Sequence, residues 1–169
     1  MLEVKVRVPR EEDLDAFFRI HADPQTNIHS RDGGTENLEQ ARGMLGVVMD
    51  SWRQDGIGYW TVTDDEDRVI GFSGLRVKQA GPADYLNLYY RYTPEVWGQG
   101  IAKHVASLAM ALAREQWPQR PVIARTRATN IPAQRVALAV GLARTGHDSD
   151  GRVVFADRRL YPSFFATLR

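Results

Sequence analysis

The segment from Leu86 to Ala102 constrains the possible fold of this chain more than any other stretch. Its first half is rich in aromatic residues and predicts a strand, which must end by Pro94 because proline has no N–H to donate to a ladder. Gly98 and Gly100 follow, and a long alanine-rich helical pattern then begins. The apolar face of that helix is predicted to contain Ile101, Val105, Leu108 and Leu112. The segment therefore predicts a strand, a tight glycine loop and a helix in succession.

A glycine loop in front of a helix is suited to holding an anion. The N–H groups of the first helical turn have no partner within the helix, and they lie at the positive end of its dipole. Glycines without Cβ atoms let a phosphate approach the backbone closely. A simple turn and helix cap with no ligand is the alternative interpretation of the same two glycines.

Length and composition exclude several classes of protein. A chain of 169 residues fits one domain, here 1–169, or at most two very small ones. The net charge of +1 makes nucleic acid an unexpected partner, and the lack of cysteine rules out disulfides, a thiol nucleophile and cysteine metal sites. The chain has no apolar run that could span a membrane and no signal-peptide core, so we expect a cytoplasmic protein.

Hydrophobic periodicity predicts an α+β fold. Alternating and β-branched runs predict strands over 2–8, 59–63, 68–78, 86–92, 122–127, 142–147 and 152–160. Helical spacing predicts helices over 11–21, 35–52 (capped by Thr35 or Asn37), 101 to Pro118, and 133–140. About four helices should thus cover the faces of a mixed, mostly antiparallel sheet of about seven strands.

One pair of strands in this sheet must be parallel. A helix crosses between the strand over 86–92 and the strand over 122–127, and such crossovers join parallel strands. A parallel pair inside an antiparallel sheet is predicted to splay, with the glycine loop at the mouth of the splay. The long polar connection over 21–35 is expected to line a binding site. The acidic run over 64–67 suggests either a metal ligand set or, as we favour, a solvated hairpin tip.

Several short motifs resemble the GNAT superfamily of N-acetyltransferases over nearly the whole chain. They are His-Ala-Asp-Pro over 21–24, Tyr-Arg-Tyr-Thr-Pro-Glu-Val-Trp-Gly-Gln-Gly-Ile-Ala over 90–102, Asn-Ile-Pro-Ala over 130–133, and Val-Gly-Leu over 140–142. The Trp-Gly-X-Gly sequence after a proline is similar to the branch that includes ribosomal-protein-alanine N-acetyltransferases.

The resemblance implies that acetyl-CoA is the cosubstrate, with no metal. Its diphosphate would be held by N–H groups of Trp97, Gly98, Gln99, Gly100, Ile101, Ala102 and Lys103. Its pantetheine would pair with the backbone of Tyr90, Arg91 and Tyr92. Asn130 would hold the pantetheine arm near the thioester, although a helix N-cap is the equally simple alternative. An N–H near Tyr92 would stabilise the oxyanion, so Tyr92 and Asn130 are the candidate catalytic positions.

By the same resemblance, the chain would transfer an acetyl group to a primary amine by direct attack in a ternary complex. The acceptor would be a protein N-terminus or a small-molecule amine. We expect a monomer or homodimer and, from the net charge and the lack of a long apolar run, no nucleic acid and no membrane as partner. A non-catalytic acyl-CoA-binding module of the same fold is the alternative, because residues that often serve as acid or base in the family are replaced. The replacements are Asn87 for glutamate, Ala137 for tyrosine, Ala133 for serine, and Glu95 where glutamine or arginine is frequent.

Other residues are weaker candidates. The possible bases near the acceptor are His21, Asp23, His29 and Asp84, each of which is otherwise a solvated loop residue. Lys103 and Arg135 are candidates for the outer phosphates, and Trp52 and Tyr85 for the border of the acceptor site.

Overall fold

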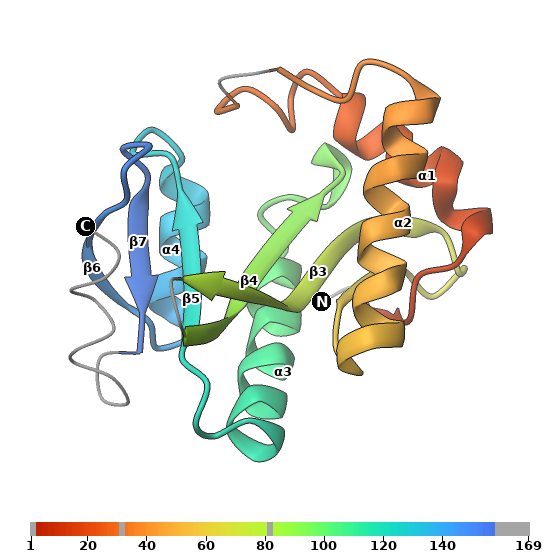
Figure 1. Cartoon of the computed structure of the whole chain (residues 1–169). Helices are drawn as coiled ribbons and strands as arrows, with labels where there is room; N and C mark the ends of the chain where they lie inside the picture. The colour runs from red at the N-terminus through yellow and green to blue at the C-terminus, as the bar shows by residue number, and fades with distance from the viewer. Residues whose placement is uncertain (1–2, 31–32, 81–82, 158–169) are drawn as a thin grey trace.

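The computed structural model describes residues 3–30, 33–80 and 83–157, which form an α+β fold (Figure 1). The α-helices of this part are α1 (Leu14–Ala22), α2 (Leu38–Asp55), α3 (Ile101–Gln116) and α4 (Ile131–Ala139). Its strands are β1 (Lys5–Arg7), β2 (Tyr59–Thr63), β3 (Val69–Ala80), β4 (Ala83–Tyr92), β5 (Val122–Thr126), β6 (Ala143–His147) and β7 (Val153–Ala156). Two 3-10 turns, η1 (Glu11–Asp13) and η2 (Pro94–Val96), precede α1 and the glycine loop. The predicted class, with four helices and seven strands, is confirmed.

All seven strands belong to one mixed sheet in the order β1-β2-β3-β4-β5-β7-β6. Every neighbouring pair is antiparallel except β4 and β5, which α3 connects as a crossover. The β3–β4 hairpin is the longest pairing and runs in unbroken register from Ala80–Ala83 to Gly71–Tyr92. The predicted parallel pair therefore lies in the middle of the sheet.

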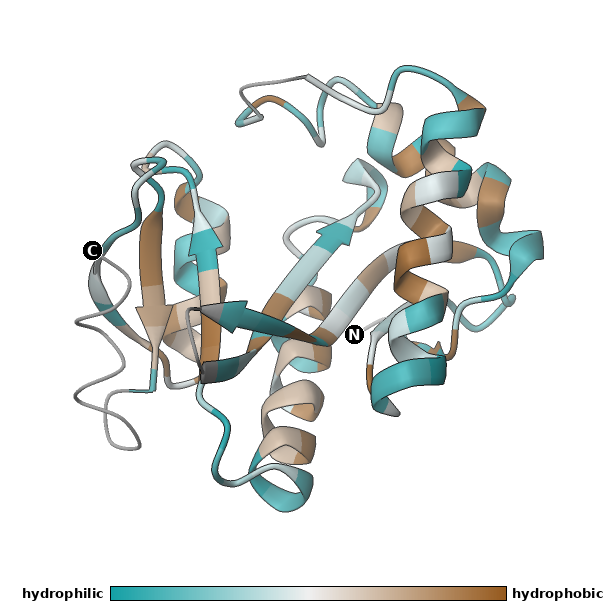
Figure 2. Cartoon of the chain, in the orientation of Figure 1, coloured by the Kyte–Doolittle hydropathy of each residue, from teal (hydrophilic) through white to brown (hydrophobic). Residues whose placement is uncertain are grey.

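Two hydrophobic layers cover the two faces of the sheet. Successive strand residues alternate between faces, so Leu86 and Leu88 pack under α3 and α4, while Phe72 packs under α1 and α2. Figure 2 shows hydrophobic residues running through α3, β5 and β7. The buried face of α3 differs from the prediction at Leu108, which is 43% exposed. Small side chains let α3 pack closely on the sheet: Ala106, Ala109 and Ala113 are all buried.

Element boundaries differ from the sequence prediction at several points. Asn37 rather than Thr35 caps α2, because its side chain accepts a hydrogen bond from Gln40 N at 2.9 Å. Asp64 is buried and bonded to Arg68 instead of lying in a fully solvated tip. The first strand is shorter than predicted, and the predicted turn at 81–82 and the strand end beyond 157 lie outside the described residues. None of the described helices has the length and hydrophobicity needed to cross a bilayer.

Candidate active site

The centre of the sheet opens between β4 and β5. In the described chain their pairing consists of Leu86–Val122 and Asn87–Ile123, and beyond this point the strands separate toward the top of Figure 1. Leu86 N–H donates to Pro121 O on the β5 side, whereas Thr93 N–H donates to Ile70 O on the β3 side. Main-chain groups alternate along a strand, so those of Tyr90 and Tyr92 face the gap.

These groups match what an extended, amide-bearing ligand needs, because it can add to the sheet like a short strand. The carbonyl of Tyr92 is already used, since it accepts a hydrogen bond from Trp97 Nε1 at 2.9 Å. The main-chain groups of Arg91 face β3 instead, so the expected backbone contact at this position is not brought into the gap. The gap thus presents the main chain of Tyr90 and the N–H of Tyr92.

The glycine loop comes soon after the end of β4 that borders this gap, and Trp97 at its start donates a hydrogen bond to Tyr92 O, so the loop lies at the mouth of the gap. Gly98 and Gly100 have φ of 75° and 80°, a region that favours glycine, and a Cβ at either would meet nothing within 4 Å. Gly100 is the N-cap of α3 and provides no side-chain cap, so the N–H groups of the first turn stay without a helical partner. This open, positively polarised backbone fits a diphosphate.

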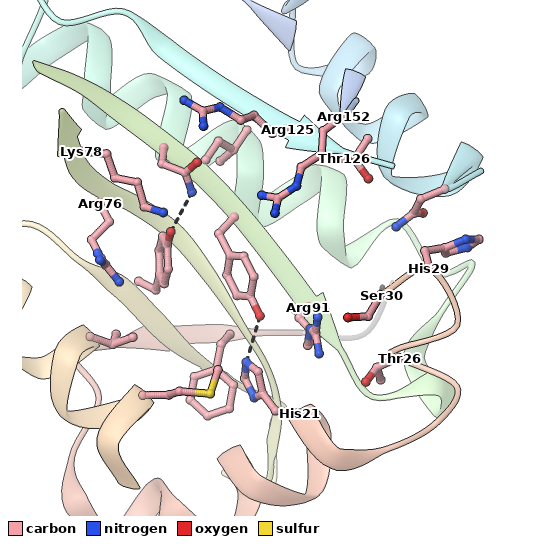
Figure 3. A pocket seen from close by; sticks show the side chains of 18 of the residues that line it. His21, Thr26, His29, Ser30, Arg76, Lys78, Arg91, Arg125, Thr126 and Arg152 are labelled. Carbon is pink, nitrogen blue, oxygen red and sulfur yellow. Dashed lines mark hydrogen bonds between the residues drawn. The ribbon is translucent and has the colours of Figure 1, made fainter. Parts of the chain in front are cut away.

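A cavity of about 500 Å³ lies beside the gap on the α1 and α2 face (Figure 3). Its apolar side is formed by Phe17, Met44, Val47 and Phe72. The α1–α2 connection closes one end, where His29 Nδ1 lies 3.1 Å from Thr129 Oγ1 of the loop before α4. This contact joins the connection over 21–35, which was expected to line a binding site, to the loop before α4 at the edge of the cavity.

Basic side chains dominate the polar side of the cavity. Six of them line it: Arg76, Lys78, Arg91, Arg125, Arg127 and Arg152. Among the described lining residues there is no aspartate or glutamate. The cavity is therefore strongly electropositive although the chain as a whole is nearly neutral.

A buried histidine and a tyrosine form one hydrogen-bonded pair in the cavity wall. His21 Nδ1 lies 2.8 Å from Phe17 O and therefore carries the proton, so Nε2 accepts from Tyr89 Oη at 2.9 Å. Burial and, to a smaller extent, the positive charge of Arg91 lower the pKa of His21 to about 4. His21 is thus neutral at pH 7.

Asn87 lies at the last paired rung of β4 and β5 and lines the cavity. Its Nδ2 donates to Tyr59 Oη at 2.7 Å, which fixes the side chain and leaves Oδ1 as an acceptor. Tyr59 in turn stacks on Tyr89, with ring centroids 4.7 Å apart. An amide at this position can orient an N–H group but cannot accept its proton.

The side chains of the predicted cofactor residues have varied surroundings. Tyr90 Oη donates to Ala133 O at 2.6 Å, and Arg91 Nη1 donates to Asn27 Oδ1 at 2.8 Å. Tyr92 is 6% exposed and packs on the α3 face, so its phenol does not line the cavity. Asn130 does line it, and its Oδ1 accepts from Ala133 N at 3.1 Å as the N-cap of α4.

Of the four candidate bases, only the two histidines line the cavity. Asp23 bonds the N–H of Gln25 in its own loop, and Asp84 lies 3.7 Å from Arg120. The residues expected to border the acceptor, Trp52 and Tyr85, do not line the cavity either. Within the described ranges, no group of three or more potential metal ligands comes together.

Sequence reasoning missed the basic side of the cavity. Arg76, Lys78 and Arg125 occupy ordinary strand positions, and nothing local distinguishes them from surface residues. Strand alternation was the one available signal, because it places Arg76 and Lys78 on the same face as Phe72.

Comparison with known proteins identifies the family. A family model described as "Acetyltransferase (GNAT) domain" matches residues 3–143. An acetyltransferase from Agrobacterium tumefaciens is similar in structure, with a TM-score of 0.77, 18% identity, and coverage of 93% of this chain and 92% of that chain. A ribosomal-protein-alanine acetyltransferase from Vibrio fischeri has a TM-score of 0.74 at 14% identity, covering 93% of each chain. A spermidine N-acetyltransferase from Vibrio cholerae, in complex with CoA and spermine, has a TM-score of 0.70 at 14% identity, covering 90% and 92%. With the family model spanning most of its length, this chain belongs to the GNAT family of acetyltransferases.

Proposed function

We propose that this protein is an acetyl-CoA-dependent N-acetyltransferase that acts on a primary amine in a ternary complex. The observation that carries the proposal is the gap between β4 and β5 with the glycine loop at its mouth. Trp97 through Lys103 would hold the diphosphate, and the main chain of Tyr90 would pair with the pantetheine arm. The neighbouring spermidine enzyme, in complex with CoA, supports this use of the fold.

The chemistry needs few groups from the protein. Bound acetyl-CoA supplies the acetyl thioester. The amine nitrogen bonds to the acetyl carbonyl carbon, the carbon–sulfur bond breaks, and the amine proton is transferred to the departing thiolate or to water. Holding both reactants in one site contributes up to about 7–11 kcal/mol in the best cases. The Tyr92 N–H, which faces the gap, is the candidate donor to the developing oxyanion.

The acceptor amine must reach the thioester as a neutral base. The described cavity walls contain no carboxylate, and His21, with a pKa of about 4, is a weak base. Asn87 Oδ1, which the bond from Nδ2 to Tyr59 does not use, would accept a hydrogen bond from the amine N–H and orient its lone pair. Orientation, rather than strong general-base catalysis, is therefore the proposed role of these residues.

A pair of matched glycine variants tests the binding part of the proposal. Gly100→Ala places a Cβ in the proposed diphosphate site, and Gly56→Ala imposes the same left-handed strain at the end of α2, where φ is 66°. Each should cost about 1–2 kcal/mol of stability. Only Gly100→Ala should weaken acetyl-CoA binding, by about tenfold or more, when the Kd is measured by calorimetry. Equal Kd values in the two variants would contradict the assignment of the loop.

The non-catalytic binding module is the second candidate. The absence of a carboxylate among the described cavity residues favours it, because many active sites use one as the base. Thiol release from acetyl-CoA with a mixed panel of amines separates the two. Acetyl-CoA binding without amine-dependent thiol release would establish the module.

A further inference from the structure

Four basic side chains gather at one end of the cavity, on the face of the sheet that carries α1 and α2 (Figure 3). Arg76 and Lys78 come from β3, Arg125 from β5, and Arg152 from the turn before β7. We call these four residues the cationic cluster. Arg76 lies directly across from Asn87, the last residue of β4 that pairs with β5. The cluster therefore adjoins the point where the gap begins.

Most of this charge has no acidic partner. Within the described ranges, Arg76, Lys78 and Arg125 take part in no ion pair, and Arg152 lies 3.7 Å from the exposed Asp150. Asp148, in the same turn, accepts through Oδ1 from the main-chain N–H groups of Asp150 and Arg152. Asp148 also acts on Tyr85, the ring that Arg125 covers, so Asp148 and Asp150 offset part of the charge on the β7 side of the cluster. The remaining like charges, those of Arg76 and Lys78 above all, destabilise the free protein, which points to a ligand that supplies further counter-charge.

Tyrosine rings hold two of the guanidinium groups in place. Arg125 lies over Tyr85, 5.1 Å from the ring centroid, and its Nη2 donates to Tyr85 Oη at 2.6 Å. Arg125 Nε is buried and has no hydrogen-bond partner in the described part of the chain. Arg76 lies 5.7 Å from the centroid of Tyr59. Both guanidinium groups are therefore oriented before any ligand binds, with donors to spare for an anion.

One member of the cationic cluster, Lys78, has a lowered pKa. Desolvation, followed by the positive charges of Arg76, Arg125 and Arg152, lowers the pKa of Lys78. A second ammonium brought into this region would meet the same charges and lose its proton more easily. A polycationic acceptor would be repelled, whereas an acceptor with an anionic group would be attracted.

Building on the proposed function, we propose that the acetyl acceptor is a small amine that carries a carboxylate or phosphate group, and that the cationic cluster binds this group. The apolar wall formed by Phe17, Met44 and Val47 receives the carbon skeleton. The volume of about 500 Å³ suits a small molecule.

Anion binding tests this inference without any turnover. Glutarate and inorganic phosphate are titrated by calorimetry into the protein saturated with CoA. Two variants, Lys78→Met and Arg76→Gln, each remove one positive charge from the cationic cluster. The control, Lys5→Met, removes a positive charge from the exposed ion pair with Asp67. One of the two anions should bind, and its Kd should rise about tenfold or more in the cluster variants. Lys5→Met should leave the Kd unchanged.

Failure to bind either anion, or equal anion affinity in Lys78→Met and Lys5→Met, would overturn the inference. The two anions also distinguish a carboxylate site from a phosphate site. A separate titration of CoA into the ligand-free protein gives the Kd of CoA and reports on the proposed function. A protein that binds acetyl-CoA but no anion refutes only the acceptor class, whereas one that binds the anion but no acetyl-CoA refutes the proposed function.

Matched acceptors extend the test to catalysis. β-Alanine and aminomethylphosphonate carry an anion, β-alaninamide has the same skeleton as β-alanine without it, and spermidine carries only positive charge. The kcat/KM of an anionic acceptor should exceed that of the neutral amide about tenfold or more, and Lys78→Met should raise its KM. A preference for spermidine or for the amide would contradict the inference.

Discussion

The buried state of His21 predicts a specific loss of stability in mild acid. Its pKa lies at about 4 in the folded protein, against an ordinary value of 6.5. Because the folded state disfavours the proton, the stability is complete above pH 6.5 and is lost as the pH falls toward 4. At pH 5 the two pKa values give a loss of about 2 kcal/mol relative to neutral pH. For a chain of this length this corresponds to a fall in Tm of about 4–8 °C.

The assay is urea unfolding at pH 7.5 and at pH 5, for the natural protein and for His21→Phe. Phenylalanine keeps the stacking on Phe17, whose ring centroid lies 3.8 Å from that of His21, and it cannot titrate. The difference in unfolding free energy between the two pH values should be about 2 kcal/mol smaller in the variant. Equal pH dependence of the two proteins would show that His21 is not held neutral, and would refute the reasoning.

Three further predictions follow from other contacts. Asp13→Asn should lower the unfolding free energy by about 2–3 kcal/mol in thermal or urea denaturation. The reason is that the buried carboxylate accepts hydrogen bonds from Nη1 and Nη2 of Arg7, a side chain that itself remains 29% exposed. Asn130→Ala and Asn37→Ala each remove a helix N-cap and should each lower the unfolding free energy by about 1 kcal/mol in thermal unfolding. Only Asn130→Ala should also weaken acetyl-CoA binding, measured by calorimetry. The kcat/KM should rise steadily with pH, because only the neutral amine attacks. At pH 7, a peptide with a free α-amine (pKa about 7.7–8.0) should have a higher kcat/KM than a peptide whose sole amine is a lysine side chain (pKa about 10.4). A sharp bell-shaped profile, or a faster lysine peptide, would reveal a general base elsewhere in the protein.

The order of elements could be predicted because the relevant signals are local. Pro94, Gly98 and Gly100 mark the strand end and the loop within a few residues, and the crossover helix then requires a parallel pair. Hydrophobic periodicity was less decisive inside α3, where Leu108 is exposed and alanines form the contact with the sheet. Helix spacing alone does not tell which of two adjacent apolar stripes faces the core.

The cavity could be predicted only in part, because its residues come from segments far apart in sequence. The sequence predicted that the connection over 21–35 lines a binding site, and His21 and His29 from this stretch do line the cavity. Whether the side chain of a strand residue such as Arg125 faces the cavity depends on which side of the sheet it points to and on which helices cover that side. The tyrosines that orient the cluster, Tyr59 and Tyr85, likewise meet their arginines only through tertiary packing.

The central claim is that the gap between β4 and β5 holds acetyl-CoA for attack by an amine. The most direct measurement follows free CoA thiol and the N-acetylated amine together, by colour reaction and mass spectrometry, for the natural protein and for Gly100→Ala. We predict amine-dependent thiol release, equimolar with the acetylated product and largely lost in Gly100→Ala. Thiol release that is independent of the amine, or unchanged in Gly100→Ala, would contradict the claim.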